Sequence, residues 1–167
     1  MPFAANEKFS TADFNAQDYP KEFKYYDQYY ASIGDSDPTL SNSQAQWFYV
    51  DKNTYPDGFN LTAVKITSFN ASTLNVQVYR GNNLATAEKV CDVTPSYFYS
   101  DMVIRLDEQQ YFAPGESFWI VAHFPVQENP YTLGMATVEN ETVASYSFMS
   151  NDMGKTWISL KNALVGS

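Results

Sequence analysis

The stretch Ala113-Pro-Gly-Glu-Ser-Phe-Trp-Ile-Val-Ala-His-Phe-Pro125 joins a turn to the most apolar run of the chain. Pro114 presets φ to about −65° and Gly115 accepts the positive φ that follows, a pair typical of a type II turn. A strand is therefore predicted to begin at about Ser117 and to end before Pro125, because proline would remove a ladder hydrogen bond. Both faces of this strand are apolar, which predicts a central strand covered on both sides. One face carries Phe118, Ile120, Ala122 and Phe124, and the other carries Trp119, Val121 and His123.

The rest of the chain favours short strands over helices. Aromatic residues make up 17% of the 167 residues, and no stretch repeats Ala, Glu, Lys and Leu at helical spacing. Turn residues separate predicted strands at 23–33, 46–50, 61–69, 74–79, 102–106, 117–124, 133–138, 144–148 and 157–160, while 84–90 reads as either a strand or a helical turn. We expect an all-β fold, an antiparallel β-sandwich of jelly-roll type.

The same patterns predict how these strands meet. Residues 61–69 and 74–79 are expected to pair as a hairpin, and Phe118, Ile120 and Phe124 are expected to share one core with Val64, Val76 and Ile104. In the strand at 144–148, Phe148 is expected to face inward with Ala144 and Tyr146. Residues 1–22 are polar and carry two prolines, so we expect a lead-in or linker segment before a domain at 23–167.

Charge and cysteine content exclude several classes of function. The formal net charge of −9 disfavours nucleic acid and anionic membrane surfaces as partners, and calcium or a basic peptide would be better suited. The single cysteine, Cys91, excludes an internal disulfide, and with a single histidine it also excludes a Cys/His zinc site. No apolar run has the length of a transmembrane helix, so we expect no membrane insertion.

One motif is specific. Ser150-Asn-Asp152-Met-Gly154-Lys-Thr156-Trp157 matches the Asp-box, Ser-x-Asp-x-Gly-x-Thr-Trp, at every defined position. In such a turn the aspartate accepts backbone N–H groups, glycine takes a conformation closed to other residues, and tryptophan packs beneath, so Trp157 is expected to be buried. The motif resembles that of sialidases and other β-propeller proteins, where it recurs once per blade and is structural. It occurs once here, so sialidase function does not carry over, and we interpret Asp152 as a turn residue rather than a catalytic one.

A wider resemblance covers about residues 25 to 160. The landmarks are Tyr-Tyr-Asp-x-x-Tyr-Ala-Ser-Ile-Gly at 25–34, Leu61-Thr-Ala-Val-Lys-Ile66, the 113–125 stretch and the Asp-box. Together they are similar to the β-sandwich domains that follow the catalytic domain in subtilisin-like and other surface peptidases of anaerobic Gram-negative bacteria. The resemblance implies an accessory module that is exported with its parent protein, with the protease triad in another domain.

The sequence contains few of the residues that catalysis would need. His123 is the only histidine, and as a general base it would need a nucleophile and an orienting carboxylate that no motif supplies. A small jelly-roll glycosidase would need only two facing carboxylates. The candidate glutamates fall in turns and loops, where water keeps them ionised; they are Glu116, Glu128, Glu139 and Glu141. We expect no catalytic residue.

Two kinds of ligand site remain open. Asp35 and Asp37 cluster in a turn as calcium ligands do, although solvated turn acids explain them more simply. Four tyrosines offer flat faces to sugars, as in carbohydrate-binding modules, while an aromatic core would give the same composition; they are Tyr26, Tyr30, Tyr97 and Tyr99.

The sequence thus predicts a non-catalytic accessory or binding domain of an exported multidomain protein, C-terminal to a peptidase. The alternatives are a carbohydrate-binding module and a small jelly-roll glycoside hydrolase. A secreted, periplasmic or cell-surface location is expected. The expected partners are a neighbouring domain of the parent and a polysaccharide or protein ligand.

Overall fold

The computed structural model describes residues 3–5, 22–23, 31–33, 41–66, 68, 73–100, 102–125, 133–135 and 146–159. Within these segments the chain is all-β, without a helix, and every strand pairing is antiparallel. The strands are β1 (Phe3–Ala5), β2 (Glu22–Phe23), β3 (Ala31–Ile33), β4 (Asn42–Tyr49), β5 (Phe59–Lys65), β6 (Asn75–Arg80), β7 (Glu88–Val93), β8 (Val103–Phe112), β9 (Ser117–Phe124), β10 (Leu133–Met135), β11 (Ser147–Ser150) and β12 (Ile158–Ser159). The predicted all-β class is confirmed.

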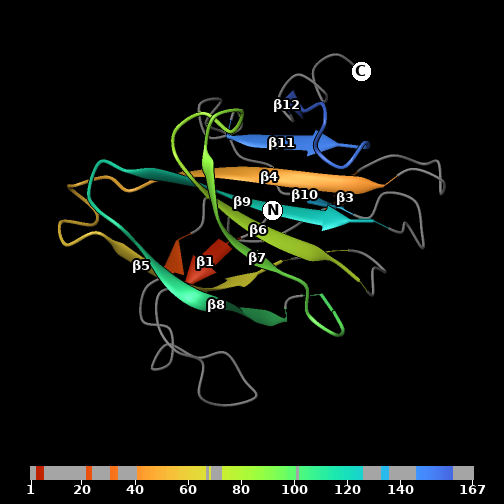
Figure 1. Cartoon of the computed structure of the whole chain (residues 1–167), viewed down its shortest axis with the longest axis horizontal. Coiled ribbons are helices and arrows are strands. Elements are labelled where there is room, and N and C mark those ends of the chain that lie inside the picture. The colour runs from red at the N-terminus through yellow and green to blue at the C-terminus, as the bar shows by residue number, and fades with distance from the viewer. Residues whose placement is uncertain are drawn as a thin grey trace.

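Strand β9 lies inside the largest sheet, as its sequence predicts. That sheet has six strands in the order β12-β11-β4-β9-β6-β7, and β9 is paired along its length with β4 and β6 (Figure 1). All eight residues of β9 are buried. A second sheet has the order β2-β1-β5-β8, and β3 pairs with β10. Burial on both faces favours apolar side chains, which explains why most residues of β9 are apolar.

One hydrophobic core joins the two larger sheets. Phe118, Ile120 and Phe124 of β9 are fully buried in a cluster that includes Val64, Val76 and Ile104, as predicted. The phenylalanine rings stack in this cluster, with 5.1 Å between the centroids of Phe48 and Phe118 and 4.3 Å between those of Phe112 and Phe118. Two antiparallel sheets that face each other across a shared core are consistent with a β-sandwich.

The turn before β9 has the predicted geometry. Gly115 has a φ of 92°, and the backbone N–H of Glu116 donates to the carbonyl of Ala113 at 3.0 Å. The Glu116 carboxylate accepts from Arg80, whose guanidinium also lies 4.3 Å from the centre of the Phe112 ring. Glu116 therefore ties the turn to the end of β6.

The predicted hairpin of 61–69 with 74–79 is wrong. Strand β5 pairs with β1 and β8 in the four-stranded sheet, whereas β6 pairs with β7 and β9 in the six-stranded sheet. The chain therefore crosses from one sheet to the other between these strands. Val64 and Val76 meet across the core. Alternation buries the same residues in either arrangement, so the pattern could not distinguish a hairpin from a crossover.

Other boundaries also differ from the predictions. The expected single strand at 23–33 contributes β2 and β3 to different sheets, and the residues between them lie outside the described part. Strand β4 begins at Asn42, whereas the sequence predicted a start at Gln46. The predicted start is too late because the strand opens with polar residues, which are nevertheless buried. Residues 84–86 form a turn before β7. Phe3–Ala5, in the expected lead-in, forms β1 and pairs with β5.

Replacing Ile120 with alanine is expected to destabilise the protein by about 2–5 kcal/mol, because Ile120 is fully buried between the sheets. Urea unfolding followed by tryptophan fluorescence measures the change. The matched control is Ile158→Ala, where the side chain is 53% exposed and the cost should stay below about 0.5 kcal/mol. Equal costs at the two positions would show that the core is misplaced.

Candidate functional site

The outer face of the six-stranded sheet carries a second apolar cluster. Ala45, Trp119 and Val121 are buried there, and the partly buried side chains packed against them include Trp47, Tyr79, Leu84, Phe148 and Trp157. All three tryptophans of the chain therefore lie on this face. Strand alternation separates the two clusters, since Phe118 and Ile120 of β9 point to the inner core while Trp119 and Val121 point outward.

The inward orientation predicted for Phe148 is wrong. Phe148 belongs to the outer cluster, with its ring centroid 5.6 Å from that of Trp119, and its neighbour Met149 packs against the inner core instead. The ring of Tyr146 packs edge-on against that of Trp47, with 4.6 Å between the ring centroids. Ala144 lies outside the described residues. A shift of one residue in a strand exchanges its faces, and the apolar residues at 146–149 fit either choice.

The Asp-box forms a loop held by its own polar side chains. Asp152 accepts the backbone N–H of Thr156 at 3.0 Å and the Thr156 hydroxyl at 2.6 Å. The Ser150 hydroxyl donates to Asp152 at 2.6 Å and accepts the backbone N–H of Gly154 at 3.0 Å. Hydrogen bonds from Ser150 and Thr156 lower the pKa of Asp152 to about 2. These bonds fit the interpretation of Asp152 as a residue that holds the turn together.

Gly154 brings this loop close to β9. Its φ is 85°, and a Cβ atom added there would lie 3.0 Å from the Trp157 ring and 3.2 Å from Cε1 of His123. Glycine is therefore required both by the backbone conformation and by the close approach. Trp157, expected to be buried, is only half-buried. One side of its ring packs on the outer cluster, and the ring also lines a pocket.

The carboxylate of Asp152 predicts an acid-dependent loss of stability. Its folded pKa of about 2 lies below the ordinary value of 3.8, so its contribution is present above pH 3.8 and is lost as pH falls towards 2. Asp152→Asn should lower the thermal unfolding midpoint at pH 6, and the gap to wild type should narrow below pH 3.8. Circular dichroism from pH 6 to pH 2.5 measures both, with the exposed Asp57→Asn as control. A gap that is constant over this range contradicts the assignment.

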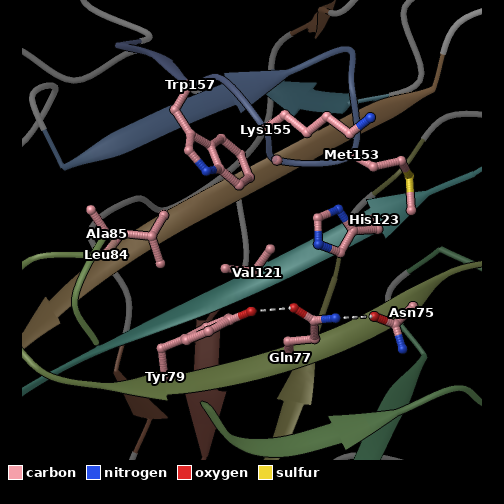
Figure 2. Close-up of a pocket in the computed structure, with 11 residues that line it drawn as sticks. Asn75, Gln77, Tyr79, Leu84, Ala85, Val121, His123, Met153, Lys155 and Trp157 are labelled. Atoms are coloured by element: carbon pink, nitrogen blue, oxygen red, sulfur yellow. Dashed lines mark hydrogen bonds between the residues drawn. The ribbon is translucent and has the colours of Figure 1, made fainter. Parts of the chain in front are cut away.

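A pocket of about 590 Å³ lies between the Asp-box loop and strand β6 (Figure 2). We call it the His123 pocket. Figure 2 shows three side chains of β6 along one side, His123 and Val121 of β9 between, and the Asp-box side chains on the opposite side. Its lining residues are Asn75, Gln77, Tyr79, Leu84, Ala85, Val121, His123, Met153, Gly154, Lys155 and Trp157.

Strand β6 presents a directed row of hydrogen bonds to this pocket. The Tyr79 hydroxyl donates to Oε1 of Gln77 at 2.6 Å, and Nε2 of Gln77 donates to Oδ1 of Asn75 at 2.9 Å (Figure 2). Nδ2 of Asn75 then donates to the Asp92 carboxylate at 2.6 Å. A carboxylate only accepts, so Asp92 fixes the direction of the whole row. Hydrogen bonds from Asn75 and Lys89 hold the pKa of Asp92 below its usual range.

His123 is a buried, neutral member of the pocket wall. Its Nδ1 lies 2.6 Å from Oγ of Ser43, and burial lowers the pKa of His123 below its ordinary value of 6.5. Ser43 is fully buried beneath the sheet surface, so its hydroxyl cannot meet a substrate. Among the described residues no carboxylate hydrogen bonds to the imidazole. The contact with Ser43 therefore orients the His123 ring.

The buried imidazole predicts a second pH effect. The folded pKa of His123 is depressed, so below pH 6.5 the unfolded chain binds a proton that the folded chain resists. Stability should therefore fall as pH drops from 6.5 towards the folded pKa. In His123→Gln this contribution is absent, and unfolding midpoints between pH 7 and pH 5 should change less than in wild type. If the unfolding midpoints of wild type and His123→Gln changed equally with pH, the lowered pKa of His123 would be contradicted.

A second pocket, of about 380 Å³, adjoins the first. We call it the Trp119 pocket. It shares Leu84, Ala85 and Trp157 with the His123 pocket, so the two pockets are adjacent at these residues. Its lining residues are Asn82, Asn83, Leu84, Ala85, Trp119, Phe148 and Trp157. The indole N–H of Trp119 is buried and has no hydrogen-bond partner within the described segments.

The described tyrosines that the sequence predicted as ligand residues lie away from both pockets. Tyr97 and Tyr99 stack at 6.1 Å and are 64% and 58% exposed, but neither lines either pocket. Tyr26, Tyr30, Asp35 and Asp37 lie outside the described residues. The segments that are described contain no cluster of three or more His, Cys, Asp or Glu side chains that would hold a metal. Cys91 is buried in the inner core, and burial raises the pKa of its thiol.

Sequence reasoning missed the polar wall formed by β6. Asn75, Gln77 and Tyr79 alternate with buried valines, which marks them as outward-facing. Nothing in the sequence places the Asp-box loop opposite them, because that contact joins segments more than seventy residues apart.

Comparisons of the chain with models of known protein families, with curated proteins and with solved structures found no match. Among the described residues, no helix is long and apolar enough to cross a membrane.

Proposed function

We propose that the chain is a non-catalytic binding domain whose two pockets bind carbohydrate. The observation that carries this proposal is the combination of tryptophan rings with a directed row of amide and hydroxyl groups on the outer sheet face. Binding sites of small ligands are concave and largely apolar, with a few fixed polar groups that determine orientation.

Sugar chemistry fits this combination. A sugar ring has an apolar C–H face that packs on aromatic rings, and hydroxyl groups around its edge that both donate and accept. The His123 pocket supplies Trp157 for the first contact. For the second, it supplies the remaining N–H of Gln77 and the oxygen of Tyr79. The amide directions are set before a ligand arrives, which reduces the entropy cost of binding.

The pocket lining supports a binding role over hydrolysis. A glycosidase needs two carboxylates across the scissile bond. The described lining of both pockets contains neither aspartate nor glutamate. Glu116, the turn glutamate weighed as a catalytic acid, is engaged with Arg80 instead. No observation favours the small glycoside hydrolase over the binding domain.

We further propose that the domain is an accessory module of an exported protein, with a jelly-roll strand order. The resemblance of the strand and turn landmarks to peptidase-associated sandwich domains supports the first point, and the many short strands separated by turns support the second. The acidic net charge of −9 supports a partner other than nucleic acid or an anionic membrane. Calcium remains a candidate ligand through Asp35 and Asp37.

Affinity gel electrophoresis tests the proposed function. The purified chain should be retarded in gels that contain one or more of xylan, mannan, mixed-linkage β-glucan and hyaluronan. Gln77→Ala should lower the affinity for the retarding polysaccharide about tenfold, because it removes the central link of the polar row. Tyr97→Ala is the matched control, since it truncates an exposed aromatic side chain outside both pockets.

Three outcomes would contradict the proposal. The first is equal loss in Gln77→Ala and Tyr97→Ala, which would move binding away from the pockets. The second is retardation by denatured casein alone, which would assign the pockets to peptides. The third is release of reducing sugar from the retarding polysaccharide, which would make the chain an enzyme.

A further inference from the structure

We infer that the two pockets are subsites of one groove, and that the groove binds a chain of two or more sugar units rather than a single sugar. This inference rests on the proposed function. It adds the class of ligand, an oligosaccharide or a stretch of polysaccharide, and a division of labour between the two pockets.

The two pockets are adjacent. Leu84, Ala85 and Trp157 line both, so the Trp157 indole stands where the His123 pocket meets the Trp119 pocket. A ligand that fills both would pass this ring. Stacking on a shared tryptophan holds one sugar unit while its neighbours extend to either side.

Strand β9 gives the groove its length. His123 and Val121 lie in the first pocket and Trp119 in the second, on the same face of one strand. Alternate residues of a strand line one face at about 3.3 Å per residue, so His123 and Trp119 lie about 13 Å apart along the floor. This length exceeds a single sugar ring and suits consecutive units of a chain.

The two pockets differ in chemistry. The His123 pocket offers the directed hydrogen bonds of Gln77 and Tyr79, which suit recognition of one hydroxyl pattern. The Trp119 pocket offers three aromatic rings and the amides of two exposed asparagines. The backbone N–H of Ala85 donates to Oδ1 of Asn83 at 3.0 Å, which leaves the Asn83 NH₂ group unpaired among the described residues. The His123 pocket therefore distinguishes sugars by their hydroxyl pattern, and the Trp119 pocket binds mainly by stacking.

Isothermal titration calorimetry with oligosaccharides of increasing length tests the inference. The probes are xylose, mannose and glucose with their β-1,4-linked oligomers up to the hexasaccharide. For the series that binds, affinity should rise at least about tenfold from the monosaccharide to the tri- or tetrasaccharide and then level off. A groove with two subsites gains contacts only until both are filled.

Variants in each pocket separate the subsites. Phe148→Ala should lower the affinity for the tetrasaccharide about tenfold and that for the monosaccharide much less. Asn82→Ala, at an exposed turn residue whose Oδ1 accepts from the Ser117 hydroxyl at 3.4 Å, should act in the same direction. Gln77→Ala should weaken monosaccharide and tetrasaccharide alike, and Tyr97→Ala should change neither.

The possible failures are distinguishable. Equal affinity for the monosaccharide and the tetrasaccharide would overturn the two-subsite groove and leave the proposed function intact. The same conclusion follows if Phe148→Ala and Asn82→Ala weaken both ligands equally. Failure of every series to bind, together with no retardation by any of the four polysaccharides, would overturn the proposed function, and this inference with it.

Discussion

The structure depends on the burial of both faces of β9. Neighbours on each edge pair its backbone, so its side chains are available to both faces of the six-stranded sheet. Inward, Phe118 and Ile120 pack in the core between the two large sheets. Outward, Trp119 and His123 form part of the groove floor. Alternate residues of this one strand therefore contribute to both the core and the site.

The Asp-box converts that floor into a walled groove. Its polar side chains accept and donate hydrogen bonds within the loop, which stabilises the turn. Gly154 then allows the loop to approach His123 closely, which places Lys155 and Trp157 over the outer face. A turn that is structural in itself thus supplies one side of the proposed binding site. The two interpretations of the motif are compatible.

The described lining of the groove carries no negative charge, although the protein is acidic. The chain carries a net charge of −9, yet the described pocket lining holds no carboxylate and a single cation, Lys155. Asp92 accepts a hydrogen bond from Asn75 and thereby orients the row of amides. Burial keeps the His123 imidazole uncharged near neutral pH. Neutral, oriented groups suit hydroxylated ligands better than they suit ions.

The sequence by itself determined the features that depend on neighbouring residues. The turn at Gly115, the central β9 strand and the burial of Val64 and Val76 follow from local sterics and from the alternation of side chains. The hydrogen-bonding groups of the Asp-box could also be identified from the sequence, since they lie within one loop. These are short-range consequences of chain geometry.

Only the tertiary structure decided which strands pair and which residues form the groove. The pattern of β5 and β6 fits a hairpin as well as a crossover, and a shift of one residue moved Phe148 to the outer face. Asn75 and Trp157 lie far apart in the chain, and their place in one pocket depends on strand order. Hydrophobic burial is non-directional, so a sequence pattern reports that a residue is covered but not what covers it.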